Sequence, residues 1–194
     1  MMNDTPDRYG VLTRLIHWTM AALIVLQFLK LGDYINDGEH WVGQTIVPLH
    51  GSLGILLFVL IVVRLAWAVS QRGQRPDYDA RLRLLVKAGH GLLYLCMILM
   101  PLSGMARGLG AGRGIKMFGS QLIEGSGEKT EWLLAFSQIH APLSWLFVAL
   151  ASGHVLAALY HHFVLKDQTL RRMAEVACAC GRGRASPARR TSTW

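Results

Sequence analysis

The sequence predicts an all-α integral membrane protein, a four-helix bundle with both termini in the cytoplasm. Of its 194 residues, 52% are hydrophobic and 16% are charged, and the mean hydropathy is +0.32. This composition is too apolar for an ordinary soluble domain of the same length. Four segments have the roughly 20 apolar residues that a membrane-spanning helix needs. They are residues 11–29, 47–69, 86–105 and 136–163.

The first span is expected to be retained, because the residues that follow it do not form a signal-peptide cleavage site. The connection after the second span, residues 70–86, holds four arginines and two aspartates, whereas residues 32–46 hold three acidic residues and no Lys or Arg. The positive-inside tendency places residues 70–86 in the cytoplasm and residues 32–46 outside. The third connection, residues 106–135, has mixed charge, and an even number of spans places it outside.

The chain is predicted to hold one transmembrane domain, residues 1–173, and a basic, disordered cytoplasmic tail, residues 174–194. The net charge of +8 belongs largely to the cytoplasmic flanks and this tail, and no nucleic-acid motif accompanies it, so no nucleic-acid partner is expected. Cys178 and Cys180 lie in the tail and Cys96 stands alone in a span, which does not suggest a disulfide or a zinc site.

The fourth span carries an unusual number of histidines for a segment in hydrocarbon. Three of them, His140, His154 and His161, are separated by fourteen and then seven residues, which returns them to nearly the same helix face. The first two lie about 21 Å apart at 1.5 Å rise per residue, so they serve different sites. A lone intramembrane histidine can simply bond to a backbone carbonyl, but several at matched depths indicate a function.

The predicted topology sorts the intramembrane histidines into two depths. His50 and His140 lie at the outer depth, and His17, His90 and His154 lie at the inner depth. Two facing imidazoles at one depth are the arrangement that holds a haem iron from both sides. Zinc would require a closed cluster of ligands at one depth, so the separated pairs favour two haems. Spacing alone leaves open whether His17 or His90 partners His154.

The sequence resembles the prokaryotic cytochrome b561 family, which comprises four-helix dihaem cytochromes of the bacterial inner membrane. The matching stretches cover about residues 9–173. They are "RLIHW", "LHGSLGILLFVLIVVRL", "AGHGLLYL" and "IHAPLSWLFVALASGHVLAALYHHFVLKDQTLRRM". The resemblance implies two haem b groups, the outer one held by His50 and His140 and the inner one by His17 and His154. The third helix supplies no iron ligand in this pattern, which implies a propionate or quinone contact for His90.

Several other polar residues near the predicted cytoplasmic surface are candidates for binding roles. Arg14 and Arg64 either extend to the lipid headgroups or pair with the propionates of the inner haem. His161 and His162 are either interfacial histidines or contribute to proton delivery and quinone contact, with His161 on the ligand face. A quinone pocket is expected to include Arg14, His90, His161 and Lys166. His40, in the acidic outer loop, is expected to be solvated.

The resemblance includes members that oxidise superoxide to dioxygen at the outer face and pass the electron to ubiquinone. Arg107, Arg113 and Lys116 form a basic stretch in the third connection, where positive charge would attract a small anion. The first alternative is a cytochrome b subunit that accepts electrons from a partner dehydrogenase or a soluble cytochrome. The second alternative is a haem-free transporter or metal-handling helical protein.

Overall fold

The computed structural model describes residues 2–32, 41–74 and 82–174. Four helical segments in it are long and apolar enough to cross a membrane, which confirms the predicted number of spans. They are Val11–Leu31, Trp41–Ser70, Arg83–Gly110 and Glu131–Phe163. The placement of the termini relative to the bilayer stays a prediction. His40, the charges of residues 33–40 and 75–81, and the predicted tail from residue 175 onward lie outside the described residues.

Each span is built around one long helix. Helix α1 (Val11–Phe28) continues into a 3-10 turn, η1 (Leu29–Gly32). Short helices α3 (Trp41–Thr45) and η2 (Val47–Leu49) lead into α4 (His50–Ser70), and α5 (Arg83–Gly110) forms the third span. Helix α6 (Glu131–Ser137) precedes α7 (His140–Phe163), and the short helix α8 (Thr169–Ala174) follows it.

The structure differs from the sequence-based prediction in three places. Helix α5 extends past the predicted span of 86–105 at both ends, because a helix that leaves the hydrocarbon can continue with polar and charged residues. The fourth span is interrupted between Ser137 and His140, so that His140 begins a new helix. The all-α prediction also missed an antiparallel hairpin of β1 (Ile115–Met117) and β2 (Ser120–Ile123).

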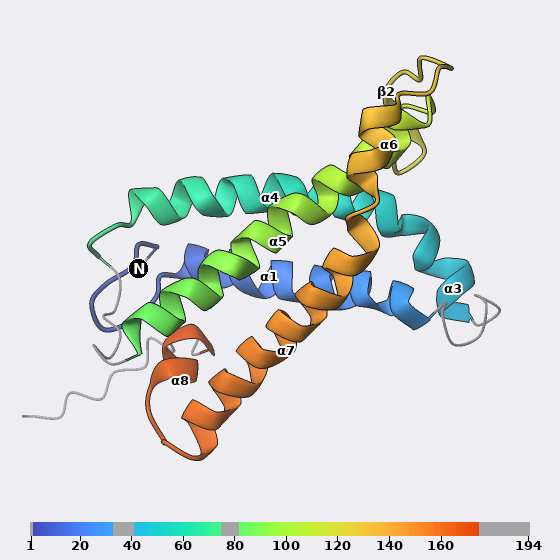
Figure 1. The fold of residues 1–194 in the computed structure, drawn as a ribbon. Helices are drawn as coiled ribbons and strands as arrows, with labels where there is room; N and C mark the ends of the chain where they lie inside the picture. The colour runs from blue at the N-terminus through green and yellow to red at the C-terminus, as the bar shows by residue number, and fades with distance from the viewer. Residues whose placement is uncertain (1, 33–40, 75–81, 175–194) are drawn as a thin grey trace, which may run out of the picture.

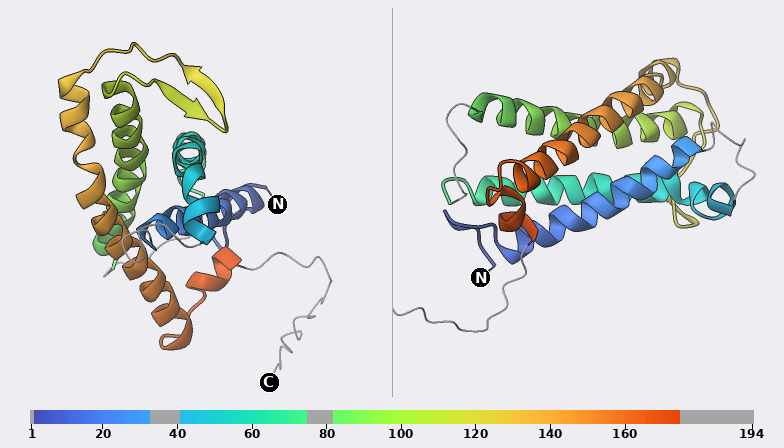
Figure 2. Two further views of the ribbon diagram at one scale, coloured as in Figure 1. Left: turned by 90° about the vertical axis from the view of Figure 1, so that its right-hand side faces the viewer. Right: turned by 90° about the horizontal axis from the view of Figure 1, so that it is seen from below.

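The long helices pack in the order α1, α4, α5 and α7, each against the next. Helices α1, α4 and α5 share a core cluster of Ile16, Met20 and Ile61, against which other apolar residues of these helices pack. Many other large apolar side chains on the spans are exposed or only partly buried, as expected for helices that face lipid tails. Figure 2 shows α5 and α7 side by side, with the hairpin reaching from one of their ends across to α4.

We call the end of the bundle that carries the hairpin the outer end and the opposite end the inner end, after the predicted orientation. At the inner end, a buried carboxylate joins α1 to α4. Asp4, which is 2% exposed, accepts hydrogen bonds from the Gly10 N–H at 2.8 Å and the Thr13 hydroxyl at 2.7 Å. The Asp4 N–H donates to Gln71 Oε1 at 3.0 Å, and Trp67 Nε1 donates to Thr13 Oγ1 at 2.8 Å. These bonds fix the register of α1 against α4.

At the outer end, the hairpin is attached to α4 by one hydrogen bond close to His50. The Phe118 N–H donates to Ser52 Oγ at 2.8 Å, and Ser52 lies two residues after His50. Phe118 has a φ of 47°, which is unusual for a residue with a bulky side chain. The contact therefore holds a strained turn beside the start of α4.

Glycines close the outer connection tightly. Gly114 has a φ of 72°, and a Cβ there would lie 2.1 Å from the carbonyl oxygen of Ile123. Gly127 has the same φ of 72°, but a Cβ there would meet nothing within 4 Å. A side chain at Gly127 would meet only the cost of a left-handed backbone, whereas a side chain at Gly114 would meet that cost and a steric clash.

We predict that Gly114→Ala lowers the thermal unfolding midpoint of the outer connection more than Gly127→Ala does. The Gly127 variant has only the left-handed backbone penalty of about 1–2 kcal/mol, whereas the Gly114 variant must also displace the β2 backbone. Tryptophan fluorescence during heating in detergent measures both, since Trp132 follows this connection. Equal midpoints for the two variants would contradict the close packing described here.

Candidate functional site

The outer pair consists of two histidines that each begin a long helix. His50 is the first residue of α4 and His140 is the first residue of α7. Their ring centroids lie 6.1 Å apart, and the ring planes are inclined by 79°. The structure thus brings together the two residues that the sequence placed at the outer depth.

Helix α5 orients the imidazole of His140. Its Nδ1 lies 3.0 Å from the carbonyl oxygen of Met100 and 3.0 Å from Ser103 Oγ, whose hydroxyl donates to the same carbonyl. A carbonyl oxygen only accepts, so Nδ1 carries the hydrogen and the lone pair is on Nε2. Gly104 permits this approach, because a Cβ there would lie 3.3 Å from Cε1 of His140. The result is the tautomer in which histidine binds a metal through Nε2.

The inner site brings three imidazoles together. The ring centroid of His154 on α7 lies 6.3 Å from that of His17 on α1, with the planes inclined by 71°. The His90 ring on α5 lies 5.4 Å from His154, with an inclination of 65°. Both residues that the sequence left as alternatives therefore face His154.

The separations fit an iron held between two imidazoles. Two metal–nitrogen bonds of about 2 Å each, added to the distance from each nitrogen to its ring centre, give about 6 Å between centroids. The outer pair at 6.1 Å and the His17–His154 pair at 6.3 Å match this value. His90 is closer to His154, at 5.4 Å. A Cβ at Gly51 or Gly153 would meet nothing within 4 Å, so the helix surface beside a ligand in each pair is open to a flat ring.

A closed zinc site finds no support in the part of the chain that the structure describes. Within residues 2–32, 41–74 and 82–174, no three His, Cys, Asp or Glu side chains converge in a way that could hold a metal ion. Cys96 is a free, buried thiol on α5. A haem supplies four iron ligands itself, so it needs two imidazoles from the protein, which is the number that each pair provides.

Arg64 on α4 contacts the inner pair. Its Nη2 lies 3.2 Å from Nδ1 of His17, and its Nε donates to the Tyr94 hydroxyl at 3.1 Å. A guanidinium only donates, so this contact uses the lone pair on Nδ1 of His17. A metal bond through Nε2 instead places the hydrogen on Nδ1. Arg64 must then turn to another acceptor, and a carboxylate suits a guanidinium best.

Arg14, one turn before His17 on α1, is buried. It is 8% exposed, and its Nε has no hydrogen-bond partner among the described residues. The expectation that Arg14 extends to the headgroups does not agree with this burial. A buried guanidinium is costly unless an anion or an acceptor satisfies it. Its position on the His17 face makes a carboxylate bound beside the inner pair the suitable partner.

Three exposed cations stand at the outer end, as the sequence suggested. Arg107 lies in the last turn of α5, Arg113 follows that helix, and Lys116 is on β1. Arg107 comes three residues after Gly104, the residue that packs against His140. The positive charge is therefore on the same side of the bundle as the outer pair.

At the inner end, His161 forms a close pair with a residue to which the sequence analysis gave no role. His161 Nδ1 lies 2.5 Å from Asp167 Oδ2, and Asp167 Oδ1 accepts the Thr169 N–H at 2.9 Å. Burial raises the pKa of Asp167, but the hydrogen bonds from His161 and Thr169 outweigh it, so the pKa is below its usual value. Lys166 adopts a left-handed backbone with a φ of 53°, which folds Asp167 back onto α7. The sequence signal was the Lys-Asp dipeptide after the two histidines.

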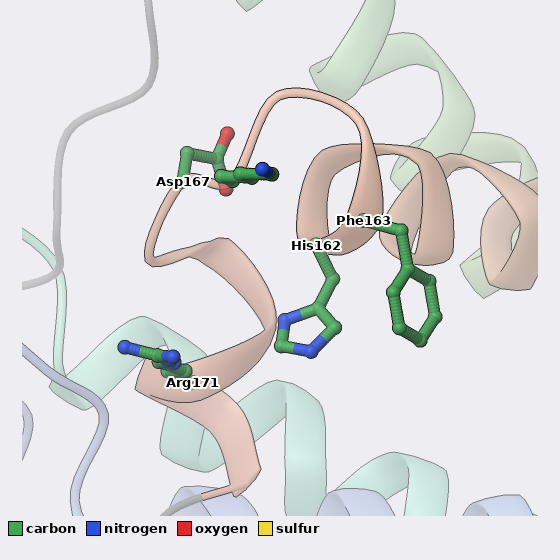
Figure 3. Close-up of a pocket in the computed structure, with 5 residues that line it drawn as sticks. His162, Phe163, Asp167 and Arg171 are labelled. Carbon is green, nitrogen blue, oxygen red and sulfur yellow. The ribbon is translucent and has the colours of Figure 1, made fainter.

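A pocket of about 270 Å³ lies between the end of α7 and α8 (Figure 3). Its lining comprises His162, Phe163, Lys166, Asp167 and Arg171. Of the four residues expected around one pocket, Arg14, His90, His161 and Lys166, only Lys166 lines it. His162 was expected to matter less than His161, yet it faces this pocket. Trp18 Nε1 donates to the Met173 carbonyl at 3.0 Å, which holds α8 against α1 near the inner pair.

Comparison with known proteins places the chain among membrane cytochromes. Residues 8–175 match the family model described as prokaryotic cytochrome b561. Cytochrome b561 homolog 2 of Escherichia coli K12 is 34% identical over 88% of this chain and 93% of its own length. The probable superoxide oxidase CybB of Yersinia pestis is 29% identical, over 86% of this chain and 95% of its own length. Cytochrome b562 of Cereibacter sphaeroides is 28% identical, over 81% and 89%. The chain therefore belongs to the prokaryotic cytochrome b561 family, bacterial membrane cytochromes that bind b-type haem and carry electrons.

Proposed function

We propose that the protein is a dihaem cytochrome of the bacterial inner membrane that oxidises superoxide at its outer end and reduces ubiquinone at its inner end. The observation that carries this proposal is the two imidazole pairs with centroid separations of 6.1 and 6.3 Å. They lie at two levels of α7, about 21 Å apart along the helix. Each haem, when bound, takes up one electron and passes it on.

The residues have separate tasks in holding the two groups. His50 and His140 would bind the outer iron, and His17 and His154 the inner iron. Arg14 and Arg64 would pair with the inner propionates, which gives Arg14 an anion and Arg64 an acceptor other than His17. His90, next to His154, would contact a propionate or the quinone.

The electron donor is proposed from the charge at the outer end and from one relative. Arg107, Arg113 and Lys116 raise the local concentration of a small anion near His140. The relative named as a probable superoxide oxidase covers most of this chain, which supports superoxide as that anion. Two superoxide ions release two electrons and leave as two dioxygen molecules. One ubiquinone takes up these two electrons together with two protons.

The protons are proposed to pass through His161. Its Nδ1 contacts Asp167, which holds the ring in one orientation. Asp167 is 37% exposed on its side chain, so this pair connects the inner end with water. Lys166 adds positive charge beside it. The described residues at this end, including Arg72, Arg83, Lys87 and Arg172, agree with a cytoplasmic orientation of the inner end and of both termini.

We predict that alanine at His50 or His140 removes the outer haem, and that alanine at His17 or His154 removes the inner one. Each variant should retain about one haem per chain, measured by pyridine haemochromogen against protein, because a single imidazole cannot hold the iron from both sides. His90→Ala should retain two. His162→Ala controls for the loss of an imidazole from α7. Loss of a haem from His90→Ala, with both retained in His17→Ala, would reverse the inner assignment.

We predict that replacing all three outer cations by glutamine slows haem reduction by superoxide about tenfold or more, the range of electrostatic steering. The wild-type rate should fall as ionic strength rises, and the rate of the variant should not, because the attraction is screened. Stopped-flow absorption at the haem α-band measures both. A double variant at the inner end, Arg72→Gln with Lys87→Gln, is the matched control and should keep the wild-type salt dependence. A wild-type rate of haem reduction by superoxide that does not change with ionic strength would favour a partner dehydrogenase or soluble cytochrome as donor.

We predict that His161→Ala keeps two haems and fast haem reduction by superoxide but slows ubiquinone reduction by about a hundredfold or more, the contribution that a general acid typically makes. The same variant is measured by stopped-flow haem reduction and by steady-state quinone reduction. The His161–Asp167 contact contributes stability that is complete above the usual carboxyl pKa of about 4. It is lost as the pH falls through the lower pKa of the folded state, so the contact persists at neutral pH. Unchanged quinone turnover would leave His161 as an interfacial histidine.

A further inference from the structure

The pocket between α7 and α8 carries two cations that the proposed electron path does not require together. Lys166 lies in the turn that joins the two helices, Arg171 lies on α8, and both line the pocket. Figure 3 shows the imidazole of His162 reaching from the end of α7 toward α8, on which Arg171 lies. The pocket is therefore built from side chains of both helices.

The charge of this pocket is not balanced by the protein around it. Lys166 and Arg171 form no hydrogen bond or salt bridge with any part of the chain that the structure describes. The carboxylate of Asp167 already accepts hydrogen bonds from His161 and from the Thr169 N–H. Two cations and an imidazole thus face one occupied carboxylate, which favours an anionic ligand with several acceptor oxygens.

The position of the pocket suggests the kind of anion. It opens where the fourth span ends, at Phe163. Phe163, Val164 and Leu165 are exposed by 67%, 60% and 50%, so an apolar strip runs from the span to the edge of the pocket. A ligand with a phosphate group and long acyl chains would match both surfaces, since basic pockets at the ends of membrane helices bind anionic headgroups.

We propose that this pocket binds the phosphate of an anionic phospholipid from the leaflet at the inner end, with Lys166 and Arg171 as its partners. The acyl chains lie along Phe163, Val164 and Leu165. The lipid fixes α8 beneath α1, where Trp18 already bonds to Met173. This site needs no haem, and its ligand is neither the electron donor nor the acceptor proposed above, although Lys166 and Asp167 also belong to the proposed proton route.

The experiment is native mass spectrometry of the purified full-length protein, titrated with phosphatidylglycerol or with phosphatidylcholine of the same acyl chains. The wild type is expected to retain one phosphatidylglycerol per chain at concentrations where it retains no phosphatidylcholine. Arg171→Gln and Lys166→Gln should each weaken retention about tenfold, because each removes a charge-assisted hydrogen bond. Lys87→Gln removes an exposed cation of α5 at the same, inner end of the bundle. This variant should weaken lipid retention less than about twofold, because a solvent-exposed charge is screened.

The remaining measurements distinguish a phospholipid from other ligands of this pocket. Inorganic phosphate at millimolar concentration should not displace the lipid, and displacement would mean a site for free phosphate. Ubiquinone should leave retention unchanged, and stoichiometric displacement would assign the pocket to the quinone. Equal retention of the two phospholipids would mean that the headgroup charge is not recognised. Equal weakening of retention by Lys87→Gln and Arg171→Gln would mean that the lipid is attracted by the basic surface in general and not by this pocket. Each of these four results overturns the proposal.

Discussion

The need to satisfy imidazole nitrogens inside an apolar bundle is the constraint on which the rest of this structure depends. A histidine in hydrocarbon has one donor and one acceptor, and leaving either without a partner costs free energy. The core cluster of Ile16, Met20 and Ile61 joins α1, α4 and α5 but does not include α7. Two ring contacts join α7 to α1. They are those of His17 with His154 and of Phe28 with Phe147. The same histidines that need partners therefore also link the fourth helix, which packs against α5, to the first.

The two pairs satisfy this constraint differently, and the difference has chemical consequences. At the outer pair, the Met100 carbonyl fixes the hydrogen on Nδ1 of His140. This carbonyl belongs to the backbone of α5 and cannot move without unwinding the helix. Such a bond makes the other nitrogen more basic, which favours oxidised iron. At the inner pair, the partner of His17 Nδ1 is the side chain of Arg64, which, unlike a helix carbonyl, can adopt another rotamer. In the proposed dihaem protein, a ligand held by a fixed carbonyl and a ligand beside a cation would give the two haems different potentials.

The sequence was sufficient for those features that depend on periodicity along one helix. Span number follows from apolar length, and the depth of His140 and His154 follows from their separation on α7. Contacts between residues that are far apart in the sequence could not be predicted in this way. Asp4 reaches Gln71 and Phe118 reaches Ser52 across 67 and 66 residues. The hairpin was missed because its strands are three and four residues long, too short for a period of two to stand out.

The inner depth shows why spacing could not choose between His17 and His90, since both rings face His154 and only the distances between centroids distinguish them. In the proposed orientation, Arg107, Arg113 and Lys116 lie on the outer side, where the positive-inside tendency disfavours cations. The hairpin gives a reason for keeping them there. A Cβ at Gly112 would lie 2.7 Å from the Glu128 carbonyl oxygen, and one at Gly114 would meet β2, so this connection is tightly closed. Charges held on a closed connection create a field with a fixed direction, and such a field attracts an anion without the reorganisation that a mobile loop requires.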